Sequence, residues 1–323
     1  MRRRQFFGLL GGVAAWPVVA HAQRPAGGDI PRIGAIFGSQ SENNTEFRNG
    51  LREAGYVDSE NILIEERLHG SAVERADEFV REFVALKCKV IFAGTPYAIR
   101  AATKATSTVP IVGVDLESDP VASGLVKSVA RPGGNFTGFF LDIPDLGGKQ
   151  IELLMEAIRQ ISRIAVVWDE TIGEVQFHAA EAAPRPPGVE LLSLPIRRVE
   201  DFSTALERAV QARAQGLILL SSPMIFLQRA RIASLALQAR MPTVSLFTVF
   251  PTVGGLMAYG PNFPLLYRQA ASYVGRILAG ANPGDLPIQR PTKFELVINL
   301  RTAKALNIEM APTLLARADE VIE

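Results

Sequence analysis

The sequence predicts an α/β protein of two similar lobes, each an open parallel sheet covered by helices. From Pro31 onward, short runs rich in Ile and Val alternate with amphipathic stretches, which is typical of β-α units. Most of these runs are apolar throughout, so both faces of each sheet should be buried. The pattern pauses at 131–140 and restarts with nearly the same spacing, which favours two separate sheets over one long one.

The first lobe should contain four strands, followed by a turn and a fifth strand. We expect the strands at 32–37, 62–68, 89–94 and 110–115, and the turn and last strand at 131–140 (RPGGNFTGFF). After the first strand, Phe47, Leu51 and Ala54 recur at helical spacing, and Gly55 follows as a helix stop. The apolar face of the segment 76–86 predicts a second helix.

The second lobe repeats this order. Its strands should lie at 163–169, 189–196, 216–222 and 242–247, with helices between them. The segment AAPRPPG at 182–188 interrupts one helix, because proline lacks an amide donor and clashes with the preceding turn. The role of the Pro184–Pro187 stretch cannot be read from the sequence.

The C-terminal part adds GGLMAYGPN at 254–262, a long helix at 264–279 and a strand at 293–300. We expect this part to return to the first lobe and then to cross again. The first lobe would then comprise 31–142 with 253–285, and the second 143–252 with 286–323. Several crossings prevent free rotation of the lobes but allow them to hinge.

The first residues, MRRRQFFGLLGGVAAWPVVAHAQ, predict a signal peptide at 1–22. Three arginines precede an uncharged stretch that is shorter than the roughly 20 residues needed to span a bilayer. It ends in AHA at 20–22, the pattern of a cleavage site, and no cysteine follows that could carry a lipid. We therefore expect a soluble periplasmic protein. Arg3 and Arg4 with Phe6 resemble a twin-arginine signal, and the general secretory route stays open.

Composition excludes several classes of partner and of chemistry. The chain has 34 basic and 33 acidic side chains; without the three signal arginines 31 basic ones remain, a net charge of −2. Nucleic acid is therefore not an expected partner. Cys88 is the single cysteine, so internal disulfides are excluded, and we expect Cys88 to pack as a small apolar residue.

Motifs for catalysis, metal binding and nucleotide binding are missing from the sequence. Only three histidines occur, one of them in the signal, and no second cysteine accompanies Cys88. No G-x-S-x-G, P-loop or G-x-G-x-x-G motif follows a strand. We expect no catalytic residue, no metal and no cofactor, and an exported two-lobed chain of this kind points to ligand binding.

A ligand of an open α/β sheet lies beyond the carboxyl ends of the strands, so the loops there supply the candidate site. The candidates are Gly38, Ser39, Gly94, Thr95, Pro96, Asp119, Trp168, Asp169, Ser221, Ser222 and Phe247. Gly-Thr-Pro at 94–96 and Ser-Ser-Pro at 221–223 share a pattern in which a hydroxyl residue caps a helix that begins with proline. Such helix ends favour an anion such as a carboxylate. Plain capping is the simpler explanation for either loop alone, and the occurrence of the pattern on both sides of the expected cleft makes a ligand role as well supported as capping.

Two further kinds of residue occur at this edge. Asp119 or Asp169 could face an ammonium group, and each is equally suited to capping a helix. Six aromatic residues lie at or near the same edge, and we expect two or three of them to contact a ligand. They are Phe37, Tyr97, Phe140, Trp168, Phe247 and Tyr259.

Long stretches of the chain resemble one known family. SVARPGGNFTGF at 128–139, GGLMAYGPN at 254–262 and PTKFELVINLRTAKALNIEMAPTLLARADEVIE at 291–323 are similar to solute-binding proteins of ABC transporters, in the branch that includes tryptophan- and tyrosine-binding components. The resemblance runs from about Pro31 to the end of the chain. It implies a type I periplasmic binding fold: two Rossmann-like lobes with parallel sheets, joined by three crossovers.

The resemblance also implies a function without chemistry. A monomeric protein would capture a small molecule, an aromatic or other amino acid, between its lobes and hand it to a permease in the inner membrane. A sensory binding protein that docks a membrane receptor would have the same fold, and an exported enzyme is a third reading. The ligand's identity and affinity and the permease partner cannot be read from the sequence.

Overall fold

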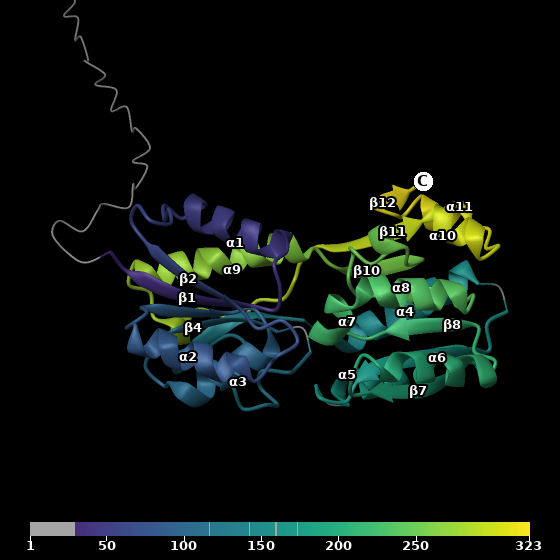
Figure 1. Cartoon of the computed structure of the whole chain (residues 1–323), viewed down its shortest axis with the longest axis horizontal. Helices are drawn as coiled ribbons and strands as arrows, with labels where there is room; N and C mark the ends of the chain where they lie inside the picture. Colours follow the sequence, from purple (N-terminus) through teal and green to yellow (C-terminus); the bar gives the residue numbers. More distant parts are fainter. Residues whose placement is uncertain (1–29, 116, 142, 159, 173) are drawn as a thin grey trace, which may run out of the picture.

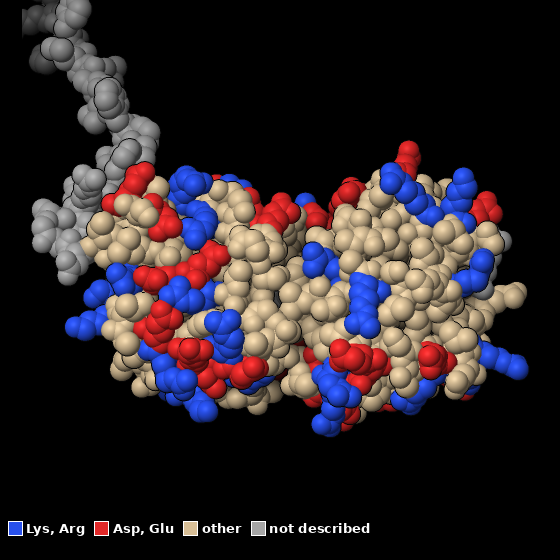
Figure 2. Space-filling view, viewed as in Figure 1, with Lys and Arg blue, Asp and Glu red and all other residues tan. Residues whose placement is uncertain are grey.

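The computed structural model describes residues 30–323 except 116, 142, 159 and 173. The predicted signal peptide at 1–22 lies outside the described residues. Two α/β lobes lie side by side and give the molecule an elongated shape (Figure 1). The two-lobe α/β prediction is therefore confirmed. On the face shown in Figure 2, acidic and basic side chains are interspersed over both lobes.

Lobe one is a five-stranded parallel sheet in the order β2-β1-β3-β4-β5. The strands are β1 (Arg32–Phe37), β2 (Leu63–Leu68), β3 (Val90–Ala93), β4 (Ile111–Asp115) and β5 (Phe136–Phe140). Two helices, α1 (Glu42–Glu53) and α9 (Phe263–Leu278), cover one face, and α2 (Arg75–Ala85) and α3 (Pro96–Ala105) cover the other (Figure 1).

Lobe two is a seven-stranded sheet in the order β12-β11-β10-β9-β8-β6-β7. Its strands are β6 (Arg163–Asp169), β7 (Glu190–Ile196), β8 (Gly216–Leu219), β9 (Thr243–Ser245), β10 (Met257–Pro261), β11 (Phe294–Asn299) and β12 (Glu320–Ile322). All neighbours pair in parallel except β10 and β11. The helices are α4 (Ile143–Ala157), α5 (Val175–Ala182), α6 (Asp201–Gln211), α7 (Pro223–Leu227), α8 (Arg229–Gln238), α10 (Leu300–Ala305) and α11 (Pro312–Leu315), with short 3-10 turns at Pro251–Val253 and Pro283–Asp285.

Several local predictions are confirmed. The strands β1 and β6 have the predicted bounds, and α5 ends at Ala182, before the prolines of the 182–188 segment. Cys88 is 3% exposed, and burial raises the pKa of its thiol to about 11, so it packs as an apolar residue. In the described part of the chain, no helix has the length and apolar character needed to cross a membrane.

The predicted lobe boundaries are wrong at two places. Residues 253–285 are divided between the lobes, because β10 pairs with β9 and β11 in lobe two while α9 packs on α1 in lobe one. The segment after α9 also stays with lobe one, where the carbonyl of Leu286 accepts a hydrogen bond from Thr137 Oγ1 and Gln289 pairs with β5. The chain therefore crosses between the lobes after β5, between β10 and α9, and between 290 and β11.

The position of β10 in lobe two follows from the similarity in strand order between the two lobes. The order β2-β1-β3-β4-β5 in lobe one corresponds to β7-β6-β8-β9-β10 in lobe two, so β10 is the counterpart of β5. Both strands follow a pair of glycines, Gly133-Gly134 and Gly254-Gly255. Both also carry a glycine at a close approach to the neighbouring strand: a Cβ at Gly138 would lie 2.0 Å from Gly113 O, and one at Gly260 1.9 Å from Leu246 O.

Candidate functional site: a pocket between the lobes

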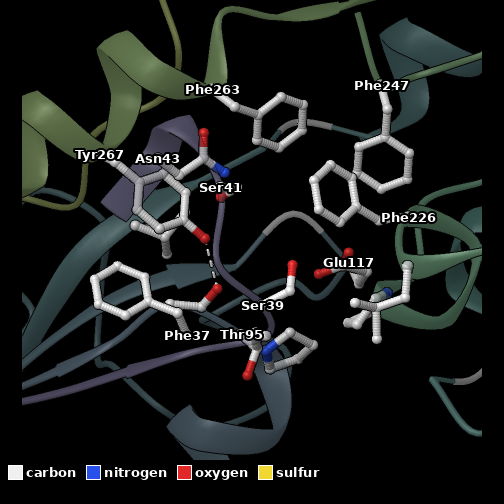
Figure 3. A pocket seen from close by; sticks show the side chains of 16 residues that line it. Phe37, Ser39, Ser41, Asn43, Thr95, Glu117, Phe226, Phe247, Phe263 and Tyr267 are labelled. Carbon is white, nitrogen blue, oxygen red and sulfur yellow. Dashed lines mark hydrogen bonds between the residues drawn. The ribbon is translucent and has the colours of Figure 1, made fainter. Parts of the chain in front are cut away.

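A pocket lies between the lobes, at the carboxyl ends of β1, β3 and β4. It encloses about 580 Å³ of space not filled by atoms, part of which is open to solvent. The described lining residues from lobe one are Phe37, Gly38, Ser39, Ser41, Asn43, Gly94, Thr95, Pro96, Val114, Glu117, Phe263 and Tyr267, and those from lobe two are Pro223, Phe226, Leu227 and Phe247. Figure 3 shows their arrangement.

Two helices of lobe one begin at this pocket. Ser41 caps α1, and Asn43 stands in its first turn. Thr95 caps α3, where its Oγ1 accepts a hydrogen bond of 3.2 Å from the amide of Ala98, and Pro96 is the first helical residue. The first amides of a helix and its dipole favour negative charge, so both helix ends are suited to an anionic group.

His69 fixes the hydroxyl of Thr95. The ring nitrogen Nδ1 lies 2.7 Å from the carbonyl oxygen of Gly70, which can only accept, so Nδ1 carries the proton. The other ring nitrogen, Nε2, then accepts a hydrogen bond of 3.1 Å from Thr95 Oγ1. Burial lowers the pKa of His69, partly offset by the Gly70 carbonyl and by Glu74, and keeps the ring neutral at pH 7.

Glu117 is the charged residue among the described lining of the pocket. Asp115, at the end of β4, holds its loop: the Asp115 carboxylate accepts from the amides of Glu117 and Ser118 and from Ser118 Oγ. Glu117 is 5% exposed, and its Oε1 accepts a hydrogen bond of 2.6 Å from Ser221 Oγ. A buried carboxylate thus faces the pocket and contacts both lobes.

Tyr267 closes the side of the pocket that faces α9. Its hydroxyl donates a hydrogen bond of 2.7 Å to the carbonyl of Gly94 (Figure 3). Burial raises the pKa of Tyr267, and the nearby charge of Glu117 raises it further, so the phenol stays protonated. The proton of this hydroxyl is therefore used in a hydrogen bond within lobe one.

Phenylalanine rings form the opposite wall. The ring of Phe247 lies 5.0 Å from that of Phe226 and 5.5 Å from that of Phe263, measured between centroids. Figure 3 places these three rings on one side of the pocket and Ser39 and Thr95 on the other. The pocket therefore has an apolar wall and a polar wall.

The structure brings six of the eleven candidate residues to this pocket. They are Gly38, Ser39, Gly94, Thr95, Pro96 and Phe247. Of the six aromatic residues at the predicted edge, Phe37 and Phe247 line it. Their contact with a ligand stays a prediction.

Four other candidates lie outside the lining of this pocket, and Asp169 lines a neighbouring pocket together with Tyr97 and Thr171. Ser222 caps α7 and donates to Asp169 Oδ2, whose Oδ1 accepts from the amide and the hydroxyl of Thr171. Ser221 binds Glu117 and Gln176. Trp168 packs against Phe177 inside lobe two, where its Nε1 donates to Ser193 Oγ.

The acidic residue that lines this pocket is neither of the two predicted ones, Asp119 and Asp169. Asp119 is exposed and caps the turn at Val121 and Ala122 instead of lining this pocket. Glu117, two residues earlier, is the acid that lines the pocket. Phe226 and Phe263 were also missed, because both belong to helices rather than to the loops that directly follow strands.

A second contact joins the lobes beside the pocket. The hydroxyl of Tyr97, on α3, lies 2.9 Å from Thr171 Oγ1 in lobe two. Because the Thr171 hydroxyl donates its own proton to the carboxylate of Asp169, the Tyr97 hydroxyl is the donor. With the Ser221–Glu117 bond, this contact defines a closed arrangement of the lobes.

The described residues offer no group of three or more His, Cys, Asp or Glu that could hold a metal ion. His178 is exposed on α5 and pairs with Glu174 and Glu181. His69 is engaged by Gly70 and Thr95.

Two α/β lobes joined by three crossings, with a partly polar and partly aromatic pocket between them, define a two-lobed binding protein. Residues 38–322 match the family described as ABC transporter substrate binding protein, and the chain belongs to this family. The family is one of substrate-binding rather than catalytic proteins, and the fold is the type I periplasmic binding fold.

One relative has a similar sequence, and two solved structures have a similar fold. The chain is 25% identical over 267 residues to a tyrosine-binding protein of Clostridioides difficile (strain R20291), covering 81% of this chain and 76% of that protein. A conserved domain protein from Vibrio cholerae has a similar structure, with a TM-score of 0.84, 23% identity, and coverage of 91% of this chain and all of that one. An ABC domain from Streptococcus pneumonia, solved in complex with L-Trp, has a TM-score of 0.83 and 20% identity, with the same coverage.

Proposed function

We propose that this protein is the extracytoplasmic solute-binding component of an ABC importer, and that it binds an amino acid with an aromatic or other large apolar side chain. The observation that carries the proposal is the pocket-facing carboxylate of Glu117, which is buried and hydrogen-bonded across the lobes to Ser221. A ligand that hydrogen-bonds to this carboxylate in the closed arrangement stabilises the same state that the Ser221 bond stabilises.

The pocket has a partner for each part of such a ligand. Glu117 faces the ammonium group, since a buried carboxylate is stabilised by a cation that hydrogen-bonds to it. The start of α1, with Ser39 and Asn43, and the start of α3 face the carboxylate. The wall of Phe226, Phe247 and Phe263 faces the side chain.

The relatives support this ligand class. One is named a tyrosine-binding protein, and another was solved with L-Trp. Family membership supports the partner, a membrane permease that receives the ligand, and with it a place outside the cytoplasmic membrane.

A thermal-unfolding screen of the purified protein tests the ligand class. The 20 amino acids are compared with phenethylamine, which lacks the carboxylate, and N-acetyl-L-phenylalanine, which lacks the ammonium group. A ligand at 100 times its dissociation constant should add about 2.7 kcal/mol to the free energy of unfolding. The large apolar amino acids should stabilise the protein, and both analogues should lose most of the effect.

Equal stabilisation by phenethylamine would contradict the proposed role of the helix ends, and a panel without effect would contradict the ligand class. Import is tested separately, by uptake of the labelled ligand into cells that carry or lack this chain.

A further inference from the structure

The lining of the pocket is divided between the lobes by polarity. In the part of the chain that the structure describes, every polar side chain of the lining belongs to lobe one. Lobe two contributes only apolar ones, from Pro223, Phe226, Leu227 and Phe247. A ligand that spans the pocket therefore meets two chemically different surfaces.

The backbone groups of Phe226 and Phe247, in the lobe-two wall, already have hydrogen-bond partners within the protein. At Phe226, the amide donates to Ser222 O and the carbonyl accepts from Arg229. At Phe247, the amide donates to Ser245 Oγ, and the carbonyl accepts from the amide of Phe250. These two residues thus present rings whose backbone groups already have partners.

The start of α7 is closed to a ligand in the same way. The hydroxyl of Ser222 accepts hydrogen bonds from the amides of Met224 and Ile225 and donates to Asp169. Pro223, the first helical residue, has no amide proton. Thr95 also caps a helix that begins with proline, but it accepts from one amide, that of Ala98, and donates to His69. Ser222 accepts from two amides and donates to a carboxylate, so the start of α7 is less suited to an anion than the start of α3.

We infer that the pocket selects an amino acid whose large side chain carries no hydrogen-bonding group, so that a phenylalanine-like ligand is preferred over tyrosine. A hydroxyl buried against the Phe226–Phe247 wall would give up its water and find no partner there. The cost of an unsatisfied buried polar group corresponds to about ten- to a hundredfold in affinity. This inference rests on the proposed function and adds the class of side chain.

Titration calorimetry with three ligands tests it on the purified protein: L-phenylalanine, L-tyrosine and 4-methyl-L-phenylalanine. The last has nearly the size of tyrosine but a methyl group in place of the hydroxyl, so it separates size from hydrogen bonding. We expect 4-methyl-L-phenylalanine to bind at least tenfold more tightly than L-tyrosine. Equal affinities, or tighter binding of L-tyrosine, would overturn the inference and leave the proposed ligand class intact.

A variant pair tests the wall itself. Leu227→Gln adds a hydrogen-bonding group beside Phe226. It should reduce the difference in affinity between 4-methyl-L-phenylalanine and L-tyrosine by about tenfold. Leu227→Met keeps the wall apolar and should leave the gap unchanged. An unchanged gap in Leu227→Gln, with an unaltered circular dichroism spectrum, also counts against the inference. Failure of all three ligands to bind would overturn the proposed function together with the inference.

Discussion

The Oγ of Ser221 in lobe two donates a hydrogen bond of 2.6 Å to Oε1 of Glu117 in lobe one, and both side chains are buried. The carboxylate that lines the pocket is therefore also part of the contact that holds the lobes together. Binding of a cation at Glu117 and closure of the lobes should be coupled, because each stabilises the same buried charge.

Glu117→Gln should weaken amino-acid binding by tenfold or more, since an ion pair with the ammonium group becomes a hydrogen bond to a neutral acceptor. The amide oxygen of glutamine can still accept from Ser221, so the change isolates the charge. Dissociation constants from calorimetry provide the measurement. Glu60→Gln, at an exposed turn of lobe one, is the control and should bind as the unaltered protein does. Equal affinity in Glu117→Gln would remove the carboxylate from the proposed site.

The second contact between the lobes should control how fast the ligand leaves. Tyr97→Phe removes the hydroxyl that donates to Thr171, a bond worth about 0.5–1.5 kcal/mol, and leaves the ring in place. We expect dissociation to be about two- to tenfold faster in stopped-flow measurements, with little change in association. The matched control is Tyr273→Phe, which removes a hydroxyl bonded to Pro287 within lobe one. If both variants release the ligand at the same rate, the Tyr97 bond does not contribute to closure.

The parts of the fold that follow from local chemistry were predictable from the sequence. RIGAIF at 32–37 is apolar and becomes β1, and the prolines after Ala183 end α5 because they cannot continue a helix. The edge of the sheet that carries the pocket was also predictable, since it follows from the direction of parallel strands.

The details that depend on packing across the chain were not predictable. Glu117 and Asp119 are both acids of one loop; Asp115 and Ser221 hold Glu117 at the pocket, whereas Asp119 caps the turn at Val121 and Ala122. Trp168 stands near the end of β6, but its side chain packs on α5, against Phe177. Phe226 belongs to α7, a helix of five residues, which is too short to show a helical period in the sequence. The division of 253–285 between the lobes depends on the pairing of β10 with β9 and on the packing of α9 against α1, which local sequence patterns do not specify.

The neutral form of His69 should make the protein less stable in acid. Burial lowers the pKa of His69 below the 6.5 of the unfolded chain, so the unfolded state takes up a proton first as the pH falls. The contribution of His69 to the free energy of unfolding is complete above pH 6.5 and is lost as the pH falls through the folded-state pKa. Urea unfolding between pH 7.5 and 5 measures this, and His69→Gln should flatten the dependence.

His178 provides a control of opposite sign. It is exposed, and hydrogen bonds to Glu174 and Glu181 raise its pKa above 6.5. The contribution of His178 to the free energy of unfolding is complete below pH 6.5 and is lost as the pH rises through the folded-state pKa. His178→Gln should therefore leave the acid-side loss intact. If His69→Gln and His178→Gln have the same pH dependence, His69 is not the group responsible for the loss.

The close packing of α1 on α9 should make Gly50 intolerant of a side chain. A Cβ at Gly50 would lie 2.3 Å from the carbonyl oxygen of Arg268 and 2.8 Å from Cβ of Ala271, so Gly50→Ala must push the two helices apart. Overpacking of this kind costs about 1–3 kcal/mol in the free energy of unfolding, which urea denaturation measures. Asn49→Ala, at the next position on α1, loses only partly exposed hydrogen bonds to Glu46 and Arg52 and should cost less than about 0.5 kcal/mol. Because α9 carries Phe263 and Tyr267 into the pocket, Gly50→Ala should also weaken ligand binding, whereas Asn49→Ala should not. Unchanged stability in Gly50→Ala would mean that α9 is not held against α1 as closely as the structure has it.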